Sequence, residues 1–170
     1  MDPVVGDGDV RVGLGFDVHR FEAGKKLVLG GVEIPSAVGL IGHSDADVLI
    51  HALMDALLGA LALGDIGDHF PNTEERYRGI SSMLLMREVV ALITQKGYRV
   101  VNVDVMVMAE KPKLAPHKAG MARLLARELG VSSEDISIKA TTMEKMGFIG
   151  REEGIAVQAV ALLASVAEGR

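Results

Sequence analysis

The first part of the chain alternates between apolar and other residues, which is the period of a β-strand with one apolar face. The apolar set is Val10, Val12, Leu14, Phe16 and Val18, and the opposite face would carry Arg11, Gly13, Gly15, Asp17 and His19. Apolar residues at 27–29 and 32–34 predict two further short strands, because the Gly30-Gly31 pair between them favours a hairpin turn.

The next segment has apolar residues spaced by three and four, which predicts an amphipathic helix. We expect this helix to begin after Ser44 as N-cap, with Asp47 in capping-box spacing, and to stop by Gly64. Asp47, His51 and Asp55 recur every four residues, so they would form one polar stripe along the helix.

The rest of the chain mixes a loop, two helices and three strands. Residues 65–80 show no clear period and are expected to form a loop. Helices are expected over 82–96 and up to 128–129, and strands over 98–109 and 136–141. In the strand over 98–109, one side would carry Val101, Val103, Val105 and Val107. Segment 154–166 alternates at first but is rich in alanine, so strand and helix both stay open, and we favour strand for its first part.

Together these elements predict an α+β fold with two layers: a mixed sheet of about four long strands, three helices on one face, and a small hairpin. We expect a flexible tail over 1–10 and a single domain over 11–170. The other face of such a sheet would expose apolar side chains unless something covers it, so we expect the chain to form an oligomer.

Composition narrows the classes of function. The chain has 170 residues, no cysteine and a formal net charge of −5. Disulfides are therefore impossible, any metal site must use histidine and carboxylate, and the acidic balance argues against general nucleic-acid binding. The chain begins without the basic stretch and apolar run of a signal peptide, and no apolar run is long enough to span a membrane, so we expect a cytoplasmic protein.

Three side chains are candidates for a metal site. Asp17 and His19 lie two residues apart on a predicted strand and so point to the same face, and His51 lies on the polar stripe of the predicted helix. A carboxylate with two imidazoles suits zinc and leaves a position open for substrate. The alternative, from spacing alone, is a chance Asp-x-His pair and an ordinary half-buried histidine.

The segment Gly42–Asp47 opens the same helix and carries His43 and Ser44. Backbone N–H groups at a helix start attract anions, and His43 could donate to developing negative charge. An ordinary capped helix start explains the segment equally well. Asp45 and Asp47 could orient ligating histidines, or they could simply compensate the helix dipole.

Three other segments offer polar groups of lower specificity. The Gly64–Pro71 loop has aspartates that suit ribose hydroxyls, although a plain helix-ending turn is also typical of this composition. Lys111 and Lys113 follow a strand and could meet a phosphate or a base edge, although such lysines are commonly solvated. Thr141, Thr142 and Glu144 end another strand, where they could hold a phosphate and a cation such as Mg²⁺ or could be ordinary strand residues.

Taken in order, these segments resemble one enzyme family over nearly the whole chain. The motifs are RVGLGFDVHRF, GHSDADVLIHALMDALLGALALGDIGDHFP, NVDVMVMAEKPKLAPH and KATTMEKMGFIGREEGIA. They are similar to the 2-C-methyl-D-erythritol 2,4-cyclodiphosphate synthases, which are lyases of non-mevalonate isoprenoid biosynthesis. The resemblance implies a homotrimer with each active site between two subunits.

The resemblance also implies roles for individual residues. Zinc would be held by Asp17, His19 and His51, and a second divalent ion, Mg²⁺ or Mn²⁺, by Glu144. His43 and Thr142 would be the catalytic groups, which stabilise the transition state and position a phosphate. The remaining substrate contacts would be Ser44, Asp65, Ile66, Gly67, Phe70, Asn72, Ala109, Lys113, Leu114, Ala115, Thr141, Phe148 and Arg151. Arg151 and Glu153 match positions near the family's threefold axis, where a phosphate-headed ligand can sit.

The chain departs from the family pattern at a few positions. Asn72 stands where the family usually has aspartate, so a carboxylate contact to the methylerythritol hydroxyls is in doubt. Leu114 and Ala115 also differ from the usual residues of the cytosine loop, where backbone contacts would survive the change.

The implied reaction releases CMP from 4-diphosphocytidyl-2-C-methyl-D-erythritol 2-phosphate and forms a cyclic diphosphate. Two other functions stay open: a metal-dependent phosphohydrolase that admits water, and a non-enzymatic trimer that binds an isoprenoid phosphate near Arg151.

Overall fold

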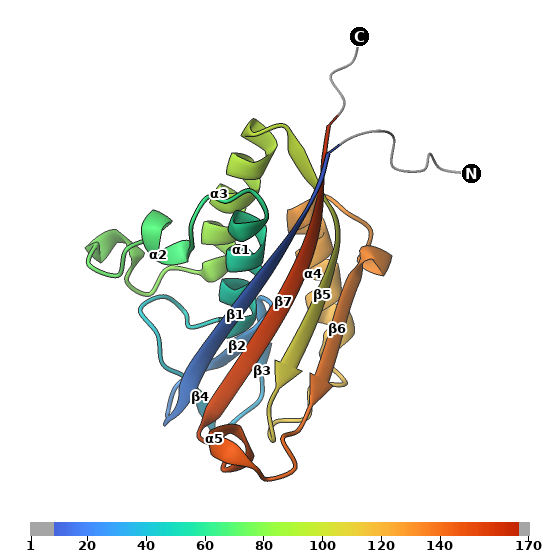
Figure 1. The fold of residues 1–170 in the computed structure, drawn as a ribbon. Coiled ribbons are helices and arrows are strands. Elements are labelled where there is room, and N and C mark those ends of the chain that lie inside the picture. Colours follow the sequence, from blue (N-terminus) through green and yellow to red (C-terminus); the bar gives the residue numbers. More distant parts are fainter. Residues whose placement is uncertain (1–8, 167–170) are drawn as a thin grey trace.

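The structure is a computed structural model, and it describes residues 9–166. A five-stranded sheet with strand order β4-β1-β7-β5-β6 forms one layer, and helices form the other (Figure 1). Neighbouring strands are antiparallel except for the parallel pair β5–β6. The strands are β1 Val10–Ala23, β4 Val38–Leu40, β5 Tyr98–Met108, β6 Ile136–Thr141 and β7 Gly154–Ser165.

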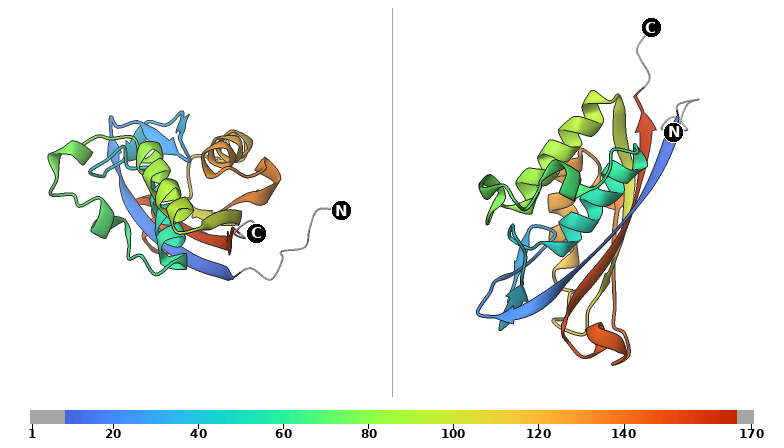
Figure 2. Two further views of the ribbon diagram at one scale, coloured as in Figure 1. Left: turned by 90° about the horizontal axis from the view of Figure 1, so that it is seen from above. Right: turned by 60° about the vertical axis from the view of Figure 1, so that its left-hand side comes forward.

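Three long helices, α1, α3 and α4, cover one face of the sheet, as the sequence predicted (Figure 2). Helix α1 packs on β1 and β7, α3 on α1 and β5, and α4 on β6. The predicted hairpin is present as the separate two-stranded sheet β2–β3. The helices are α1 Val48–Ala60, α2 Ile66–His69, α3 Ser82–Gln95, α4 Lys118–Leu129 and α5 Gly147–Gly150, and the hairpin strands are β2 Leu27–Leu29 and β3 Val32–Ile34.

The α+β class and the four long strands are confirmed, and the fifth strand, β4, is a short addition at the edge beside β1. Segment 154–166 is strand as far as Ser165, so the helical alternative is excluded. Residues 65–80 hold more structure than the expected loop, because α2 and a 3₁₀ turn over Glu75–Tyr77 lie within them.

Helix α1 begins later and ends earlier than expected. Its N-cap is Asp47, whose carboxylate accepts the Ile50 N–H at 3.2 Å. The prediction of Ser44 as N-cap was wrong, because the Ser44 hydroxyl is directed at His51 and Ser82 instead. Gly64 is not the stop either, since the helix ends at Ala60.

The buried carboxylate of Asp47 also ties the hairpin to α1. It accepts the N–H groups of Gly30 at 2.9 Å and Gly31 at 2.8 Å, which are the two turn residues between β2 and β3. The predicted polar stripe of α1 therefore faces the protein interior at Asp47 and His51, which are 0% and 7% exposed.

A β-bulge in β5 removes Val101 from the buried face on which the sequence predicted it. Val103, Val105 and Val107 are buried under the helices as predicted. Pairing with β7 shifts register between Val100 and Asn102, so Val101 is the extra residue and Val100 takes its buried place. A bulge of this kind reverses the side-chain alternation on one side of it.

The predicted tail over residues 1–10 is too long, because residues 9 and 10 already pair with β7. Val10 pairs with Ala164, and the Asp9 carbonyl accepts the Ser165 N–H at 2.9 Å. The rest of that expected tail, residues 1–8, lies outside the described residues.

The face of the sheet opposite the helices exposes apolar side chains from β1 and β7. Val12, Leu14 and Phe16 are 68%, 60% and 57% exposed, and Val18 and Val160 lie on the same face. These five residues form what we call the apolar sheet face. Among the described residues, no helix is long and apolar enough to cross a membrane.

Candidate active site

Two glycines on β1 bring α1 close enough to assemble a site across the two layers. A Cβ atom on Gly13 would lie 1.8 Å from the Ala56 carbonyl oxygen, and one on Gly15 would lie 1.8 Å from that of Ala52. Only glycine therefore permits this approach of the helix backbone to the strand. His51, one residue before Ala52 on α1, is thereby held above the β1 residues that follow Gly15.

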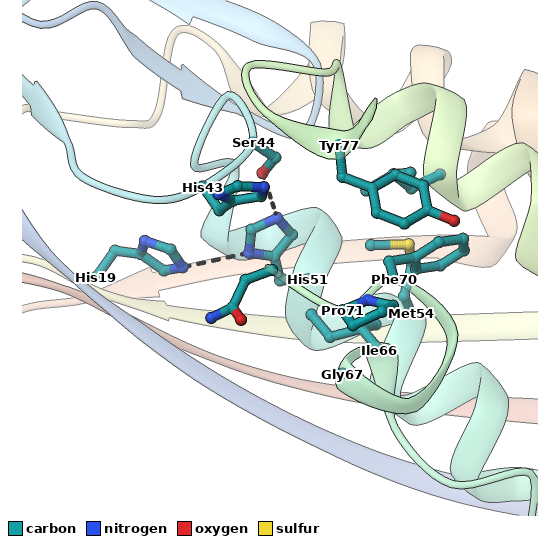
Figure 3. Close-up of a pocket in the computed structure, with 12 residues that line it drawn as sticks. His19, His43, Ser44, His51, Met54, Ile66, Gly67, Phe70, Pro71 and Tyr77 are labelled. Atoms are coloured by element: carbon teal, nitrogen blue, oxygen red, sulfur yellow. Dashed lines mark hydrogen bonds between the residues drawn. The ribbon is translucent and has the colours of Figure 1, made fainter. Parts of the chain in front are cut away.

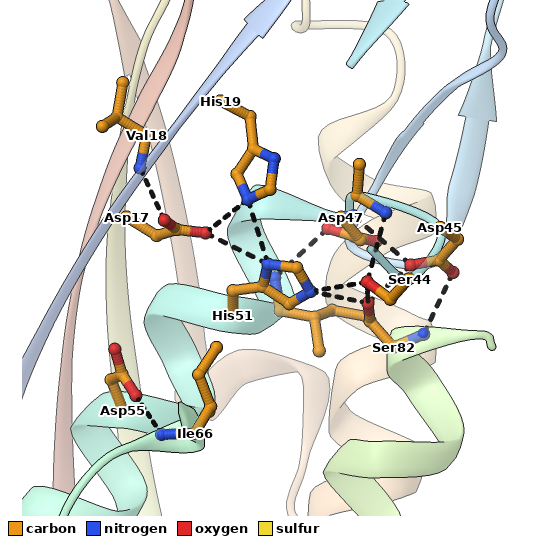
Figure 4. A network of polar contacts seen from close by, with 12 residues as sticks. Asp17, Val18, His19, Ser44, Asp45, Asp47, His51, Asp55, Ile66 and Ser82 are labelled. Atoms are coloured by element: carbon orange, nitrogen blue, oxygen red, sulfur yellow. Dashed lines mark hydrogen bonds and ion pairs between the residues drawn. The ribbon is translucent and has the colours of Figure 1, made fainter. Parts of the chain in front are cut away.

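Asp17, His19 and His51 converge as the sequence predicted (Figure 4). Asp17 Oδ2 lies 2.9 Å from His19 Nε2 and 3.1 Å from His51 Nδ1, and the two ring nitrogens are 3.2 Å apart. Donors bound tetrahedrally to zinc at about 2.0–2.1 Å would be separated by about 3.3 Å. The three donors thus have the chemistry and the mutual spacing of a zinc site.

The outer nitrogens of both imidazoles have hydrogen-bond partners, and this sets which nitrogen faces the cluster. His19 Nδ1 donates to the Ile41 carbonyl, and His51 Nε2 lies 3.0 Å from Ser44 Oγ and 2.9 Å from Ser82 Oγ. With the proton on the outer nitrogen, each inner nitrogen has its lone pair free for a cation. Such outer partners orient ligating histidines in metal sites.

Ser82 is a site residue that sequence reasoning missed. It is fully buried at the start of α3, and its hydroxyl donates to Asp45 Oδ1 at 2.5 Å, while its N–H donates to Asp45 Oδ2 at 3.1 Å. A relay therefore runs from His51 through Ser82 to the Asp45 carboxylate. Of the two aspartates proposed to orient histidines, Asp45 does so through Ser82, and Asp47 instead caps α1 and holds the hairpin turn.

The charges of the cluster favour a cation. Burial opposes ionisation of Asp17, but hydrogen bonds with His19 and His51 outweigh it, so the pKa of Asp17 lies well below its usual value. Burial also opposes protonation of His19, but Asp17 and the Ile41 carbonyl raise its pKa above the usual value. A metal ion at this position would replace the proton that Asp17 favours on the His19 imidazole. Nearby, burial raises the pKa of Asp47 to about 6 even though three backbone N–H groups donate to it.

A cavity of about 330 Å³ opens beside the two histidines (Figure 3). His43 and Ser44 form its rim next to His51, and the His43 ring is 3.4 Å from the Glu74 carbonyl. Four of the other predicted substrate residues also line this cavity: Ile66, Gly67, Phe70 and Asn72. Met54, Pro71, Tyr77 and Leu85 complete the wall and were not predicted, since their types are typical of ordinary core residues.

Asp65, predicted to bind ribose, caps α2 next to this cavity. Its Oδ1 accepts the N–H groups of Gly67 at 2.8 Å and Asp68 at 3.2 Å. The residue is exposed, so a ligand in solution can reach it.

The other predicted residues form a second group at the far ends of β5 and β6. Ala109 and Leu114 have buried side chains, so only their backbone groups can face a ligand. Thr142 donates to Glu144 at 3.0 Å, and both side chains are exposed, as are Lys113, Ala115 and Thr141. Near α5, Phe148 is 44% exposed and Arg151 donates to Glu153 at 2.6 Å.

Within one chain this second group does not share a cavity with the first group, which consists of the metal-site residues and the residues that line the cavity beside them. The sheet places Asp17, Val157, Val107 and Ala140 side by side on four successive strands. At about 4.8 Å per strand, Ala140 lies about 14 Å from Asp17. None of the second-group residues lines the cavity beside the histidines.

Comparison with known proteins assigns the chain to a family. The model of the YgbB family matches residues 10–164, which hold every residue of both groups. The chain belongs to the YgbB family. Relatives named 2-C-methyl-D-erythritol 2,4-cyclodiphosphate synthase include one from Desulfitobacterium hafniense, 57% identical over 92% of this chain and 99% of the relative. Another, from Pseudomonas paraeruginosa, is 57% identical over 91% of this chain and 98% of the relative. The resemblance proposed from the sequence is confirmed.

Solved structures of this family share the fold. The chain matches the bifunctional IspDF from Campylobacter jejuni with a TM-score of 0.90 and 42% identity, covering 94% of this chain but only 43% of that one. It matches IspF from Plasmodium falciparum, described as a CDP complex, with a TM-score of 0.82 and 34% identity, covering 92% of this chain and 97% of that one. The chain therefore spans less than half of the bifunctional protein and nearly all of the Plasmodium falciparum IspF chain.

Proposed function

We propose that this YgbB-family chain converts 4-diphosphocytidyl-2-C-methyl-D-erythritol 2-phosphate into 2-C-methyl-D-erythritol 2,4-cyclodiphosphate and CMP. The oxygen of the 2-phosphate forms a bond to the β-phosphorus, and the bond from that phosphorus to the bridging oxygen of CMP breaks. The enzyme is thus a phosphorus–oxygen lyase. We assign this activity to a single domain over residues 11–170.

The observation that carries the proposal is the convergence of Asp17, His19 and His51 beside a cavity, with the outer nitrogens of both imidazoles held by other partners and the inner nitrogens directed at the cluster. A protein nucleophile is not needed, because the attacking phosphate belongs to the substrate. The donor set suits a reaction that must bring two anions together.

Asp17, His19 and His51 would hold zinc, and Glu144 would hold a second divalent cation, Mg²⁺ or Mn²⁺, together with phosphate oxygens of the substrate. Bound cations would neutralise phosphate charge and polarise phosphoryl oxygens, which contributes several kcal/mol. This contribution is large enough to matter, since two unit charges about 4 Å apart repel by roughly 4 kcal/mol at an intermediate dielectric.

The residues of the cavity would position the substrate. His43 and Ser44 would donate to the phosphate end, and Thr142 would hold the phosphate that leaves with the nucleoside. Ile66, Gly67, Phe70 and Asn72 would enclose the methylerythritol and ribose parts, with Asp65 at the ribose hydroxyls. Holding a flexible chain for in-line attack can supply up to about 7–11 kcal/mol, so positioning is the larger contribution.

We also propose a homotrimer in which the second group of one subunit completes the cavity of the next. Two features support it: the apolar sheet face needs a cover, and the two groups lie about 14 Å apart within one chain. The cytosine would then lie against Ala109, Lys113, Leu114, Ala115 and Thr141 of a neighbouring copy. Arg151 and Glu153 would lie near the threefold axis, and Phe148 would contact the substrate.

Incubation with the cytidine substrate and Mg²⁺, with and without a zinc chelator, tests the proposal. We expect CMP and a cyclic diphosphate in equal amounts, and loss of both with the chelator or in His51→Ala. His117→Ala is the matched control, because His117 lies outside the cavity and makes no capping hydrogen bond with its side chain. A linear phosphate product in place of the cyclic one would contradict cyclisation and indicate a phosphohydrolase.

A further inference from the structure

The loop that follows β6 has an unfavourable backbone conformation. Glu144 and Lys145 are consecutive non-glycine residues with positive φ angles of 50° and 65°. A Cβ atom makes this left-handed region costly, so such residues persist only where the surroundings hold them there. The same loop carries Thr142 and Glu144, the two polar residues proposed to meet the substrate phosphates and the second cation.

One carboxylate fixes this loop from the side of β5. Glu110, which follows Ala109 after the end of β5, accepts the Met143 N–H at 2.9 Å and the Lys145 N–H at 3.2 Å, both on Oε1. These two amides flank Glu144. The Glu110 side chain is only 4% exposed, although it belongs to a loop. Burial alone would raise the pKa of Glu110, but the two N–H groups and Lys145 bring it below its usual value.

The loop is also held from its other side. A Cβ atom on Gly150 would lie 2.2 Å from the carbonyl carbon of Lys145, so α5 packs directly on the loop backbone. Met146 donates its N–H to the Met143 carbonyl at 2.8 Å, which closes the turn. The Lys145 ammonium lies 3.3 Å from Glu110 and 3.8 Å from Glu152 at the surface.

We propose that Glu110 is a positioning residue whose buried carboxylate, through the Met143 and Lys145 amides, holds Thr142 and Glu144 in place for the substrate diphosphate and its divalent cation. The inference rests on the proposed function for what the loop binds. The 3.0 Å hydrogen bond from Thr142 to Glu144 shows that the loop already sets these two side chains against each other. Glu110 acts through hydrogen-bond geometry, and its charge is secondary.

Two conservative variants separate geometry from charge. Glu110→Gln loses the charge but keeps a carbonyl oxygen at the same reach. Glu110→Asp keeps the charge, but its side chain is shorter by one methylene, about 1.5 Å, so contacts of 2.9 and 3.2 Å pass beyond hydrogen-bond range. Both changes are small enough to preserve the fold, which circular dichroism and zinc content would verify.

The first readout is amide hydrogen exchange, which needs neither substrate nor metal. We expect the Met143 and Lys145 amides to be protected in the wild type and in Glu110→Gln. In Glu110→Asp they should exchange at least about tenfold faster, because the local opening that releases them becomes easier.

The second readout is CMP release as a function of substrate and Mg²⁺. Glu110→Asp should raise KM and the Mg²⁺ concentration for half-maximal rate, and lower kcat/KM by about 10- to 100-fold, since misplacement by about 1 Å has effects of this size. Glu110→Gln should stay within about threefold of the wild type, because a neutral acceptor still pairs both N–H groups. Lys145→Ala should also stay close to the wild type, because the Lys145 side chain is 72% exposed and water screens its attraction to Glu110.

Three results would overturn the inference: the reverse order, with Glu110→Gln impaired and Glu110→Asp normal; equal behaviour of both variants; or a Lys145→Ala loss as large as that of Glu110→Asp. Failure of the proposed function looks different, because the wild type would then release no CMP. The exchange readout would still decide whether Glu110 holds the loop.

Discussion

Replacing Ser82 with alanine removes the middle of the relay that orients His51. The hydroxyl of Ser82 lies 2.9 Å from His51 Nε2 and donates to Asp45 at 2.5 Å in a fully buried position. Without it, His51 loses one partner on its outer nitrogen, and the orientation of the inner nitrogen toward the proposed metal position is less well fixed.

The contacts that remain in the Ser82→Ala variant indicate how much zinc affinity should be lost. Loss of an outer partner of a ligating histidine weakens metal binding by about 10- to 100-fold, or about 1.4–2.7 kcal/mol. Ser44 Oγ remains at 3.0 Å from His51 Nε2, and the Ser82 N–H still holds Asp45. We therefore expect a loss near tenfold for Ser82→Ala and near 100-fold when Ser44 is replaced as well.

Zinc affinity is measured by competition with a chromophoric chelator at fixed pH. Ser81→Ala is the matched control, because Ser81 is the neighbouring exposed residue and its side chain makes no capping hydrogen bond to α3. Unchanged affinity in Ser82→Ala, or an equal loss in Ser81→Ala, would refute the relay.

Three further predictions follow from the same geometry. Gly15→Ala places a methyl group 1.8 Å from a carbonyl oxygen of α1, so the helix must shift; we expect about 1–3 kcal/mol lower stability by denaturant unfolding and a marked loss of zinc. Wild-type zinc content in that variant would contradict the close approach. Asp47→Ala removes a helix cap and leaves the buried Gly30 amide and the partly buried Gly31 amide without their acceptor. This should lower stability by about 2–4 kcal/mol in the same assay, whereas a change below about 0.5 kcal/mol would contradict it. The proposed zinc would have to displace the His19 proton, and Asp17 holds the pKa of His19 above its ordinary value of about 6.5. Affinity should therefore begin to fall at a higher pH than for an ordinary histidine ligand, by about tenfold per unit per displaced proton. Titrations between pH 5 and 8 would show this slope, and a flat profile would contradict it.

Long periodic segments could be predicted from the sequence, because their pattern and their packing agree. The alternation over Val10–Val18 and the spacing over 82–96 each match an observed element. The bulge at Val101 could not be predicted, since a row of valines has the same composition on either side of it. The cap of α1 was misplaced because the hairpin turn that recruits Asp47 is folded against it from another part of the chain.

The candidate site was likewise predictable only in part from the sequence. Asp17 and His19 are linked by strand period, and His51 could be added because it lies on a predicted polar stripe. Ser82 is 31 residues from His51 and carries no signal of its own, so only the packing of α3 on α1 reveals it. Glu110 is likewise an ordinary glutamate in the sequence, and its role is visible only once the loop after β6 folds over it.

The proposed function requires one cation bound jointly by a carboxylate and two imidazoles on facing elements. X-ray diffraction from crystals of the zinc-loaded protein, measured on both sides of the zinc absorption edge, would locate that cation. We predict one anomalous peak per chain, about 2.0–2.2 Å from Asp17 Oδ2, His19 Nε2 and His51 Nδ1. A peak elsewhere, or zinc bound by only one of the two histidines, would contradict the account.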